Sequence, residues 1–335
     1  MIKRIGSRTI EFTEPPSILS YASVVGKKEG EGPLGGLFDK IICDSYDGLD
    51  TYEDAESKLQ TEAMTLAMQK GEMKKSDIDL VFAGDLLNQC VGSTFGLKDF
   101  KIPYLGQYGA CSTMAQNLIA ASVFVSSGAA EKAACSTSSH FCSAERQYRY
   151  PLEYGSVRTP TAQWTVTGAG CCIIGKDSKR IKISRATVGK IIDLGVTDAN
   201  NMGAAMAPAA AETIAAFFKD TGSAPEDFDS IFTGDLGEVG SKSLNDLLKK
   251  EGYDIRKNHS DCGLLIYDRE LQDVHAGGSG CGCCASVLCS KIIKEMESMR
   301  LKNILFIATG AMLSSTTAAQ SKTIPSIAHL VQLKT

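Results

Sequence analysis

The sequence lacks the features that would carry a chain into a membrane. Its most apolar stretch, residues 118–130, is interrupted by serines and is too short to span a bilayer. The charged residues at the N-terminus have no apolar segment behind them, so the sequence predicts no signal peptide. Basic residues never form a run long enough to make a polybasic membrane patch. Any membrane association is therefore expected to be peripheral.

Basic residues are slightly outnumbered by acidic residues. The chain carries 35 Lys and Arg against 39 Asp and Glu, which gives a formal net charge of −4. A general nucleic-acid binder normally presents a basic face, so we expect no nucleic-acid partner. Imidazole and indole groups are scarce as well, with four histidines and a single tryptophan, Trp164. Any site that needs either group therefore has few candidates.

Cysteine, in contrast, is abundant. The 335 residues include 12 cysteines, and without a secretory signal these are most simply interpreted as reduced thiols. Cys281 and Cys284 have a CxxC spacing, but no second pair with zinc-site spacing accompanies them, which favours packing of small residues over a metal site. An apolar fraction of 43% and a charged fraction of 22% are typical of a globular chain, here long enough for two packed halves.

The chain contains an internal repeat. A shift of 150 positions places residues 62–86 on residues 212–236, with seven identities in 25 positions. Chance would give about one or two on ordinary composition. Each copy predicts an alanine-rich helix, a short polar link and a buried strand that ends in Gly-Asp. The identical pairs are Glu62/Glu212, Asp77/Asp227, Asp79/Asp229, Phe82/Phe232, Gly84/Gly234, Asp85/Asp235 and Leu86/Leu236.

A second correspondence, at a shift of 164, places Cys111 on His275. In both copies a turn of small residues and a helix follow, predicted over 115–125 and 281–296, and another strand follows each helix. Ligands of open α/β sheets bind at the carboxyl ends of strands, where such turns lie. We therefore expect Cys111 and His275 to share one pocket between the two halves.

Alternating strands and helices predict an α/β fold with parallel strands and right-handed crossovers. Two related halves are expected. The first, residues 1–178, carries the Cys111 turn, and the second, residues 179–335, carries the Asp235 and His275 turns. The divide between them falls in a charged turn that follows an apolar strand.

The turn around Cys111 and the glycine-rich turn around His275 resemble the nucleophile turn and its second-half partner in the thiolase superfamily. Three longer stretches, 107–113, 158–168 and 273–282, resemble more specifically the stage V sporulation protein AD family. The resemblance covers essentially the whole chain. It implies a thiolase-like fold in which two pseudo-twofold-related halves form a layered αβαβα core.

The resemblance also implies a function. It implies binding of dipicolinic acid (pyridine-2,6-dicarboxylate), free or as its Ca²⁺ chelate, by a subunit of the SpoVA system that moves this acid into the developing spore. The membrane subunits of that system are the implied partners, and the implied location is peripheral, at the inner membrane of the forespore and spore. The superfamily also implies a homodimer, here expected through the strand around residues 132–137.

The sequence departs from the catalytic pattern of that superfamily at two positions. Where condensing enzymes carry His or Asn after a second-half strand, this chain has Asp235, which cannot donate to an oxyanion unless it is protonated. Where thiolases carry a second cysteine, residues 308–312 contain none. We therefore expect a non-catalytic, ligand-binding protein with no cofactor.

The groups expected to contact the ligand lie near the two turns. Helix N-termini favour carboxylates, an imidazole can donate to one, and an indole ring can stack on a pyridine. A Ca²⁺ ion that accompanies the ligand would prefer oxygen atoms such as those of Asp235. The predicted ligand-binding residues are Cys111, His275, Asp235, Ser112, Trp164 and Thr309, with no resident metal.

Two other functions stay open on the sequence alone. Cys111 could be the catalytic nucleophile of a thiolase- or ketoacyl-synthase-type acyltransferase. Alternatively, the pocket is vestigial and the chain is a scaffold for membrane partners. Asp85, the repeat equivalent of Asp235, is expected mainly to cap its own turn.

Overall fold

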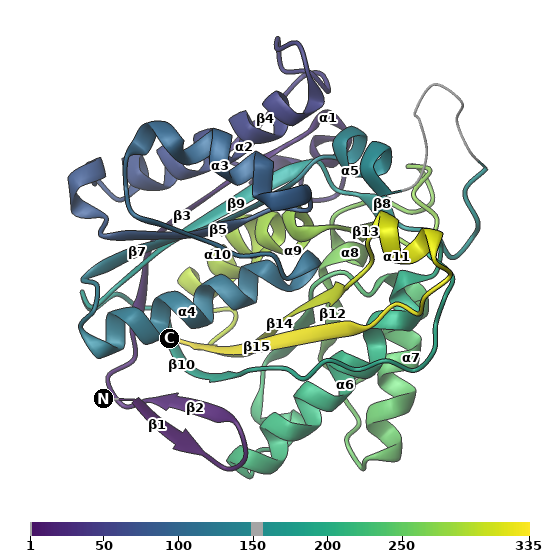
Figure 1. Ribbon diagram of the computed structural model, residues 1–335. Helices are drawn as coiled ribbons and strands as arrows, with labels where there is room; N and C mark the ends of the chain where they lie inside the picture. Colours follow the sequence, from purple (N-terminus) through teal and green to yellow (C-terminus); the bar gives the residue numbers. More distant parts are fainter. Residues whose placement is uncertain (1, 149–156) are drawn as a thin grey trace.

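The apolar runs of the sequence form one large mixed sheet, because a run without alternation is buried on both faces. In the computed structural model, which describes residues 2–148 and 157–335, β9 (Gly168–Gly175) and β14 (Asn303–Ala311) are buried almost throughout (Figure 1). The other strands are β1 (Ile2–Ile5), β2 (Thr9–Phe12), β3 (Ser17–Val25), β4 (Lys40–Ile41), β5 (Leu80–Gly84), β6 (Tyr104–Gly106), β7 (Lys132–Ser139), β8 (Trp164–Thr165), β10 (Lys182–Thr187), β11 (Ser230–Thr233), β12 (His259–Asp261), β13 (Gly278–Ser279) and β15 (Ser326–Lys334).

Local capping fixes where the first long helix begins. Thr51 accepts a hydrogen bond from the backbone N–H of Asp54, 3.1 Å away, and so starts α2 (Tyr52–Lys70). The other helices are α1 (Lys27–Gly30), α3 (Val91–Leu97), α4 (Thr113–Ser127), α5 (Phe141–Tyr148), α6 (Met202–Thr221), α7 (Gly237–Lys250), α8 (Cys262–Leu265), α9 (Cys281–Val287), α10 (Ile293–Glu297) and α11 (Ser315–Ala319). A π-helical turn, η8 (Leu288–Ile292), joins α9 to α10.

The two halves of the chain repeat one strand order. The main sheet runs β12-β11-β14-β15-β10-β3-β9-β7-β5-β6. Outward from its centre the order is therefore β3-β9-β7-β5-β6 in the first half and β10-β15-β14-β11-β12 in the second. β3 and β10 meet where Ser17 pairs with Lys182. β9 ends at Gly175 and β10 begins at Lys182, on either side of the predicted divide.

The expectation of a parallel sheet is wrong for part of the fold. β5 runs parallel to β6 and β7, and β11 runs parallel to β12 and β14, as crossover helices require. β9 and β15, however, run antiparallel to their neighbours on both sides. The helices that precede these two strands, α5 and α11, lie at one end of the sheet (Figure 1), so the chain turns back there.

Helices and sheet strands alternate in five layers (Figure 1). α2 packs against β3 and β9 on one outer face, and α6 packs against β14 and β15 on the other. Between them, α4 contacts strands of both halves and α9 packs on α4 and on first-half strands. Met114, Leu118 and Val125 of α4 are fully buried, and burial of each such side chain contributes about 1.5–3 kcal/mol. The layered αβαβα arrangement is confirmed.

The internal repeat is confirmed at the level of single hydrogen bonds. The carboxylate of Asp79 accepts from the backbone N–H groups of residues 131 and 132, at the start of β7. The carboxylate of Asp229 accepts in the same way from residues 302 and 303, at the start of β14. Each aspartate therefore ties a strand to its neighbour at the same point of the two halves.

The strand expected to pair across a homodimer lies inside the sheet. β7 pairs with β5 on one side and with β9 on the other, so neither of its edges is open. The outermost strands are β6 and β12. The expected contact at residues 132–137 is therefore wrong, because β5 and β9 already pair with the two edges of β7. The homodimer itself stays a prediction.

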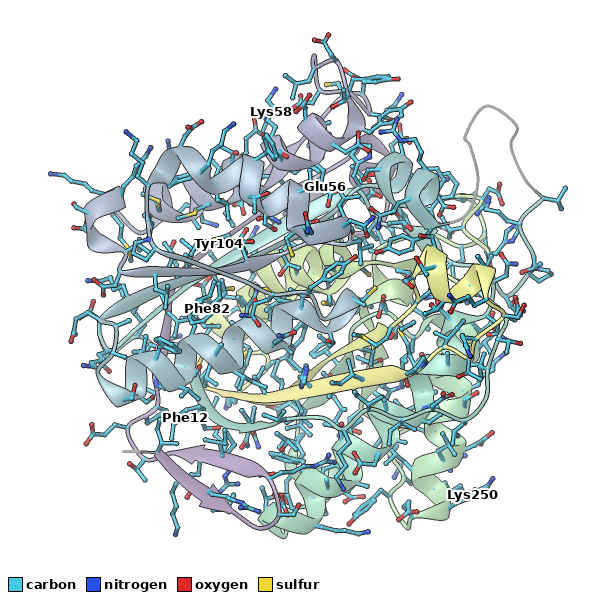
Figure 2. All side chains as sticks on the ribbon, viewed as in Figure 1. Phe12, Glu56, Lys58, Phe82, Tyr104 and Lys250 are labelled. Atoms are coloured by element: carbon cyan, nitrogen blue, oxygen red, sulfur yellow. The ribbon has the colours of Figure 1, made fainter. Side chains whose placement is uncertain are left out.

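Buried charge accompanies the apolar core in the first half. On α2, Glu56 is fully buried, whereas Lys58 points to solvent (Figure 2). Glu56 accepts hydrogen bonds from the hydroxyls of Ser138 (3.1 Å) and Ser143 (2.7 Å). Burial, with the charge of Asp85 nearby, raises the pKa of Glu56 to about 8. Near neutral pH this side chain is therefore mainly the uncharged acid.

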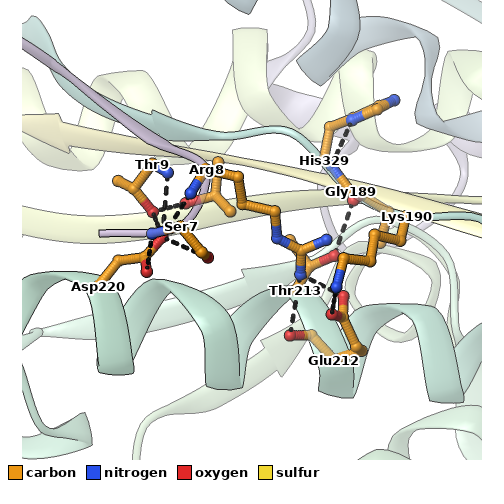
Figure 3. Close-up of polar contacts among 11 residues, drawn as sticks. Ser7, Arg8, Thr9, Gly189, Lys190, Glu212, Thr213, Asp220 and His329 are labelled. Carbon is orange, nitrogen blue, oxygen red and sulfur yellow. Dashed lines mark hydrogen bonds and ion pairs between the residues drawn. The ribbon is translucent and has the colours of Figure 1, made fainter. Parts of the chain in front are cut away.

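The N-terminal hairpin of β1 and β2 is tied to α6 by Asp220 (Figure 3). The Asp220 carboxylate accepts hydrogen bonds from the backbone N–H groups of Ser7 (2.6 Å), Arg8 (3.1 Å) and Thr9 (3.0 Å) and from the Thr9 hydroxyl (2.8 Å). Burial alone would raise the pKa of Asp220, but these hydrogen bonds outweigh burial and lower it to about 2. Arg8 also pairs with Glu212 on the same helix.

We predict that Asp220→Asn lowers the free energy of unfolding by about 1–3 kcal/mol, because an amide offers one acceptor oxygen where the donors now share a carboxylate. The folded pKa of Asp220 is below its unfolded value of about 4, so its contribution is present above about pH 4 and is lost as the pH falls towards 2. Urea unfolding should show a gap between wild type and variant that is constant near neutrality and narrows below pH 4.

The matched control is Asp246→Asn, at an exposed position on α7. It should leave the urea midpoint at pH 7 unchanged. Equal midpoints for wild type and Asp220→Asn at that pH would contradict the account of the hairpin.

Candidate functional site

Cys111 lies in a tight turn, η5 (Ala110–Ser112), immediately before α4. Ala110 adopts a left-handed φ of 50°, which is uncommon for a residue with a side chain. β14 packs directly against this turn, since a Cβ at Gly310 would lie 2.7 Å from the carbonyl oxygen of Gly109. The turn is therefore fixed between the two halves, and Cys111 in it is buried.

The Cys111 thiol lies close enough to the carboxylate of Asp235 for the charge of Asp235 to act on it. Asp235 follows β11 and is itself buried. It also accepts hydrogen bonds from the backbone N–H of Gly280 (2.9 Å) and from the hydroxyls of Ser279 (3.0 Å) and Thr309 (2.7 Å). One carboxylate thus joins the Cys111 turn, the start of α9 and the strand β14.

The surroundings of Cys111 favour the thiol over the thiolate. Burial raises the pKa of Cys111 well above its usual range, and the charge of Asp235 and the hydrogen bond to it raise the pKa further. The N–H of Gly280 and the nearby N-terminus of α4 act in the opposite direction but are outweighed. A protonated thiol that donates to a carboxylate is a poor nucleophile.

A narrow pocket of about 50 Å³ opens beside Cys111. A space of this size has room for a few water molecules. Its described lining is largely apolar, carries one carboxylate, that of Glu145, and contains no lysine or arginine. The lining includes Leu86, Met202, Leu313, Tyr148, Thr165 and Ser279. A ligand would therefore have to widen the pocket.

The structure brings three of the six predicted ligand-binding residues together. Cys111 lines the pocket, and Asp235 and Thr309 lie behind it in one hydrogen-bonded group. Ser112 is adjacent, but its hydroxyl is used within the turn, where it donates to the carbonyl oxygen of Gly109 at 2.6 Å. Contact of these residues with a ligand stays a prediction.

His275 does not reach this pocket, contrary to expectation. Its Nδ1 lies 2.7 Å from the carbonyl oxygen of Thr159, and its Nε2 lies 2.9 Å from the carboxylate of Asp273. The imidazole is partly exposed, at 29% of its side-chain surface. His275 is therefore placed among surface groups and not opposite Cys111.

An insertion before α9 explains the displacement. α4 begins at Thr113 and α9 at Cys281, so the structural shift between the halves is 281 − 113 = 168 rather than 164. The residue equivalent to Cys111 is therefore Ser279, which lines the pocket and donates to Asp235. The sequence match that gives a shift of 164 covers only three residues, which is too few to reveal the insertion.

Trp164 is separated from the pocket by the alternation of a strand. In β8 its neighbour Thr165 lines the pocket, so the Trp164 side chain points to the opposite side. There its ring stacks on Phe141, with 3.8 Å between centroids, and the cations of Lys28 and Arg158 lie over it. Trp164 therefore does not line the Cys111 pocket.

Two buried side chains that support the site were not foreseen. Asp261, at the end of β12, accepts hydrogen bonds from the backbone N–H groups of residues 236 (2.9 Å) and 237 (3.0 Å) and so fixes the loop that carries Asp235. Burial raises the pKa of Asp261 to about 7. Gln163 donates to the carbonyl oxygen of Asp235 at 2.7 Å. Its position within the motif 158–168 is the signal that could have revealed it.

The equivalent position in the first half has a structural role. Asp85 accepts hydrogen bonds from the backbone N–H groups of Leu87 (2.8 Å) and Ser93 (2.7 Å) and so caps its own turn, as predicted. Among residues 2–148 and 157–335, no three or more His, Cys, Asp or Glu side chains are grouped so that they could hold a metal ion. No helix in the same residues has the length and apolar character needed to cross a membrane.

Comparison with protein families gives one match over almost the whole chain. Residues 6–334 match the family model for stage V sporulation protein AD (SpoVAD). The stage V sporulation protein AD of Bacillus subtilis (strain 168) is 47% identical over 328 residues, which cover 98% of this chain and 97% of that protein.

Comparison with solved structures gives the fold. The 3-oxoacyl-[acyl-carrier-protein] synthase III of Aquifex aeolicus superimposes with a TM-score of 0.60 at 12% identity, covering 96% of this chain and all of that one. A single-substitution variant of OleA from Xanthomonas campestris also gives a TM-score of 0.60, at 14% identity, covering 97% and 99% of the two chains. At such low identity these likenesses show a fold of the thiolase and ketosynthase type and nothing about activity.

We predict that Cys111 reacts slowly with iodoacetamide between pH 7 and 9, at least ten-fold more slowly than the exposed Cys43 of the same molecule. Asp235→Asn should speed the labelling of Cys111 several-fold, because the carboxylate charge no longer opposes the thiolate. Peptide mass mapping after timed quenching measures both rates.

The matched control for this experiment is Asp85→Asn, at the repeat-equivalent position. It should leave the labelling of Cys111 unchanged. If Cys111 in the wild type labels as fast as Cys43, the protonated-thiol description is wrong.

Proposed function

Because the chain belongs to the stage V sporulation protein AD family, we propose that it is a non-catalytic subunit that binds dipicolinic acid during spore formation. The observation that carries the non-catalytic part is the burial of Cys111 beside the buried Asp235, which disfavours the thiolate. The ligand is the one that the family resemblance implies. The thiolase-like fold then serves as a binding scaffold.

A condensing enzyme needs a thiolate and hydrogen-bond donors for an oxyanion. Here the group beside the sulfur is Asp235, whose pKa is raised by burial and whose ionised form only accepts. Near its end β14 carries Thr309, whose hydroxyl donates to that same carboxylate and is not available as an acid or base. These features disfavour acyl transfer at this site.

Acyl transfer is the second candidate, favoured by the placement of Cys111 in a turn at the start of a helix beside a pocket. It would require Asp235 to lose its charge or to move when substrate binds. A scaffold with a vestigial pocket is the third candidate, and it predicts no small-molecule ligand at all.

The partners follow from the same proposal. We place the protein peripherally at the inner membrane of the forespore, with the membrane subunits of the SpoVA system as its partners in moving dipicolinic acid into the spore. Homodimerisation, if it uses the sheet, would take place at β6 or β12, the outermost strands.

Calorimetric titration of dipicolinic acid, with and without Ca²⁺, tests the proposal on the purified protein. We predict saturable binding at one site per chain. Benzene-1,3-dicarboxylate, which has the same two carboxylates without the ring nitrogen, is the matched control, and it should bind without a Ca²⁺ effect because it cannot chelate the ion in the same way. Absence of dipicolinic acid binding both with and without Ca²⁺ would contradict the proposed function and favour the scaffold.

A further inference from the structure

We propose that the carboxylates of the ligand are recognised outside the Cys111 pocket, by a cationic site on the other side of β8. This site consists of Lys28, Arg158 and His275 gathered around Trp164 and Asp273. The inference rests on the proposed function, since it names the groups that would hold the dicarboxylate. It follows from where the structure places positive charge.

The indole of Trp164 is a platform between an aromatic ring and two cations. Phe141 stacks on one face, with 3.8 Å between centroids and 7° between planes. The Nζ of Lys28 lies 3.9 Å and the Cζ of Arg158 lies 4.7 Å from the indole centroid. Because Phe141 fills the first face, both cations lie over the opposite one. Cation–π attraction holds each of them there.

Three donors converge on one exposed residue, Asp273. Arg158 donates to the Asp273 carbonyl oxygen at 2.9 Å and pairs with its carboxylate. The Nζ of Lys28 lies 3.5 Å from the same carbonyl oxygen, and the Nε2 of His275 lies 2.9 Å from the carboxylate. The Asp273 side chain is 73% exposed, so a carboxylate from solution can take its place among these donors.

Asp273 does not supply a hydrogen-bond acceptor for every N–H group around it. The Nη1 of Arg158 is buried and has no hydrogen-bond partner among the residues that the structure describes. An unsatisfied buried donor of a charged group is unfavourable, and a second carboxylate would supply an acceptor. Burial is the main cause that lowers the pKa of Lys28, and the charge of Arg158 is the second. The charge of Asp273 acts in the opposite direction and raises this pKa. A bound dianion would offset the repulsion between the two cations.

The acidic side chains near this site have hydrogen-bond or ion-pair partners outside it. Glu29 is buried and accepts hydrogen bonds from the backbone N–H of Thr167 at 3.0 Å and from the hydroxyl of Tyr267. Glu31 lies 3.8 Å from Lys27 in an exposed pair. Asp44, in the adjoining cavity, accepts from the backbone of its own turn. The positive groups around Trp164 are thus the ones that face Asp273.

Space and charge both favour this site over the Cys111 pocket. The cavity that adjoins Lys28, Phe141 and Trp164 measures about 430 Å³, within the range of small-molecule sites. The pocket beside Cys111 measures about 50 Å³ and its described lining has no lysine or arginine. The larger cavity, whose lining includes Lys27 and Lys28 together with Glu29, Glu31 and Asp44, supplies room, and the cations over Trp164 supply the positive charge.

The test uses the full chain and the emission of Trp164, its single tryptophan. Dipicolinic acid is titrated into wild type and into Lys28→Met, Arg158→Gln and His275→Gln. We expect the wild-type emission to change on binding, and the affinity to fall at least ten-fold in Lys28→Met and in Arg158→Gln, because each loses a charge-assisted contact. His275→Gln, which keeps a donor, should fall less.

Matched controls distinguish the loss of a charge at this site from the loss of a charge elsewhere on the protein. Lys219→Met removes the same charge at a position on α6 outside this cavity, where the side chain is 65% exposed, and should leave affinity within two-fold. Cys111→Ser and Ser279→Ala change the other pocket and should also stay within two-fold. Thermal melts of every variant confirm that it is folded.

The outcomes distinguish the two proposals. Wild-type binding in calorimetry that is unchanged in Lys28→Met and Arg158→Gln, or that is lost in Cys111→Ser or Ser279→Ala, overturns this inference and leaves the proposed function intact. No calorimetric binding of dipicolinic acid by the wild type, with or without Ca²⁺, overturns the proposed function and this inference with it.

Discussion

The buried carboxylate of Asp235 is the group on which the rest of the pocket depends. It is held by donors from the start of α9 and from β14, and its charge acts on the nearby thiol of Cys111. A buried charge must be hydrogen-bonded on all sides or its desolvation is unfavourable. Meeting that requirement fixes the meeting point of the two halves, and the same bonds hold Cys111 as a thiol.

Much of the fold could be predicted from the sequence, because its repeat is local. The match of 62–86 to 212–236 contains a helix, a link and a strand, and the aspartates that tie neighbouring strands recur within it. The antiparallel course of β9 and β15 could not be predicted in this way. It depends on where α5 and α11 lie after the chain leaves the sheet, which periodicity does not encode.

The candidate site was predicted in part, and the errors have physical causes. Cys111, Asp235 and Thr309 each stand at the end of a repeated element, so their meeting followed from the fold. His275 was misplaced because a short insertion shifts Ser279 into the equivalent position. The charges around Trp164 come from segments near residues 28, 158 and 273, which no local pattern connects. Only tertiary structure brings them together.

Trp164 and Thr165, which are neighbours in the short strand β8, face opposite sides of that strand. Thr165 faces the pocket that contains the thiol, and Trp164 faces the cations. The pocket beside Cys111 is narrow, and the surroundings of Cys111 favour its protonated thiol. A larger cavity, with Lys27 and Lys28 but also Glu29, Glu31 and Asp44 in its lining, lies on the Trp164 side of the same strand. The proposed binding role rests on the charges at these two places.

The central claim is that Cys111 does not act as a nucleophile, and intact-mass measurement tests it most directly. The purified protein would be incubated with acetyl-CoA and with longer acyl-CoA thioesters, alongside Cys111→Ser. The account predicts no mass increase in either protein, because the thiol stays protonated against Asp235. A stoichiometric acyl adduct that forms on the wild type, maps to Cys111 and is absent from Cys111→Ser would contradict it.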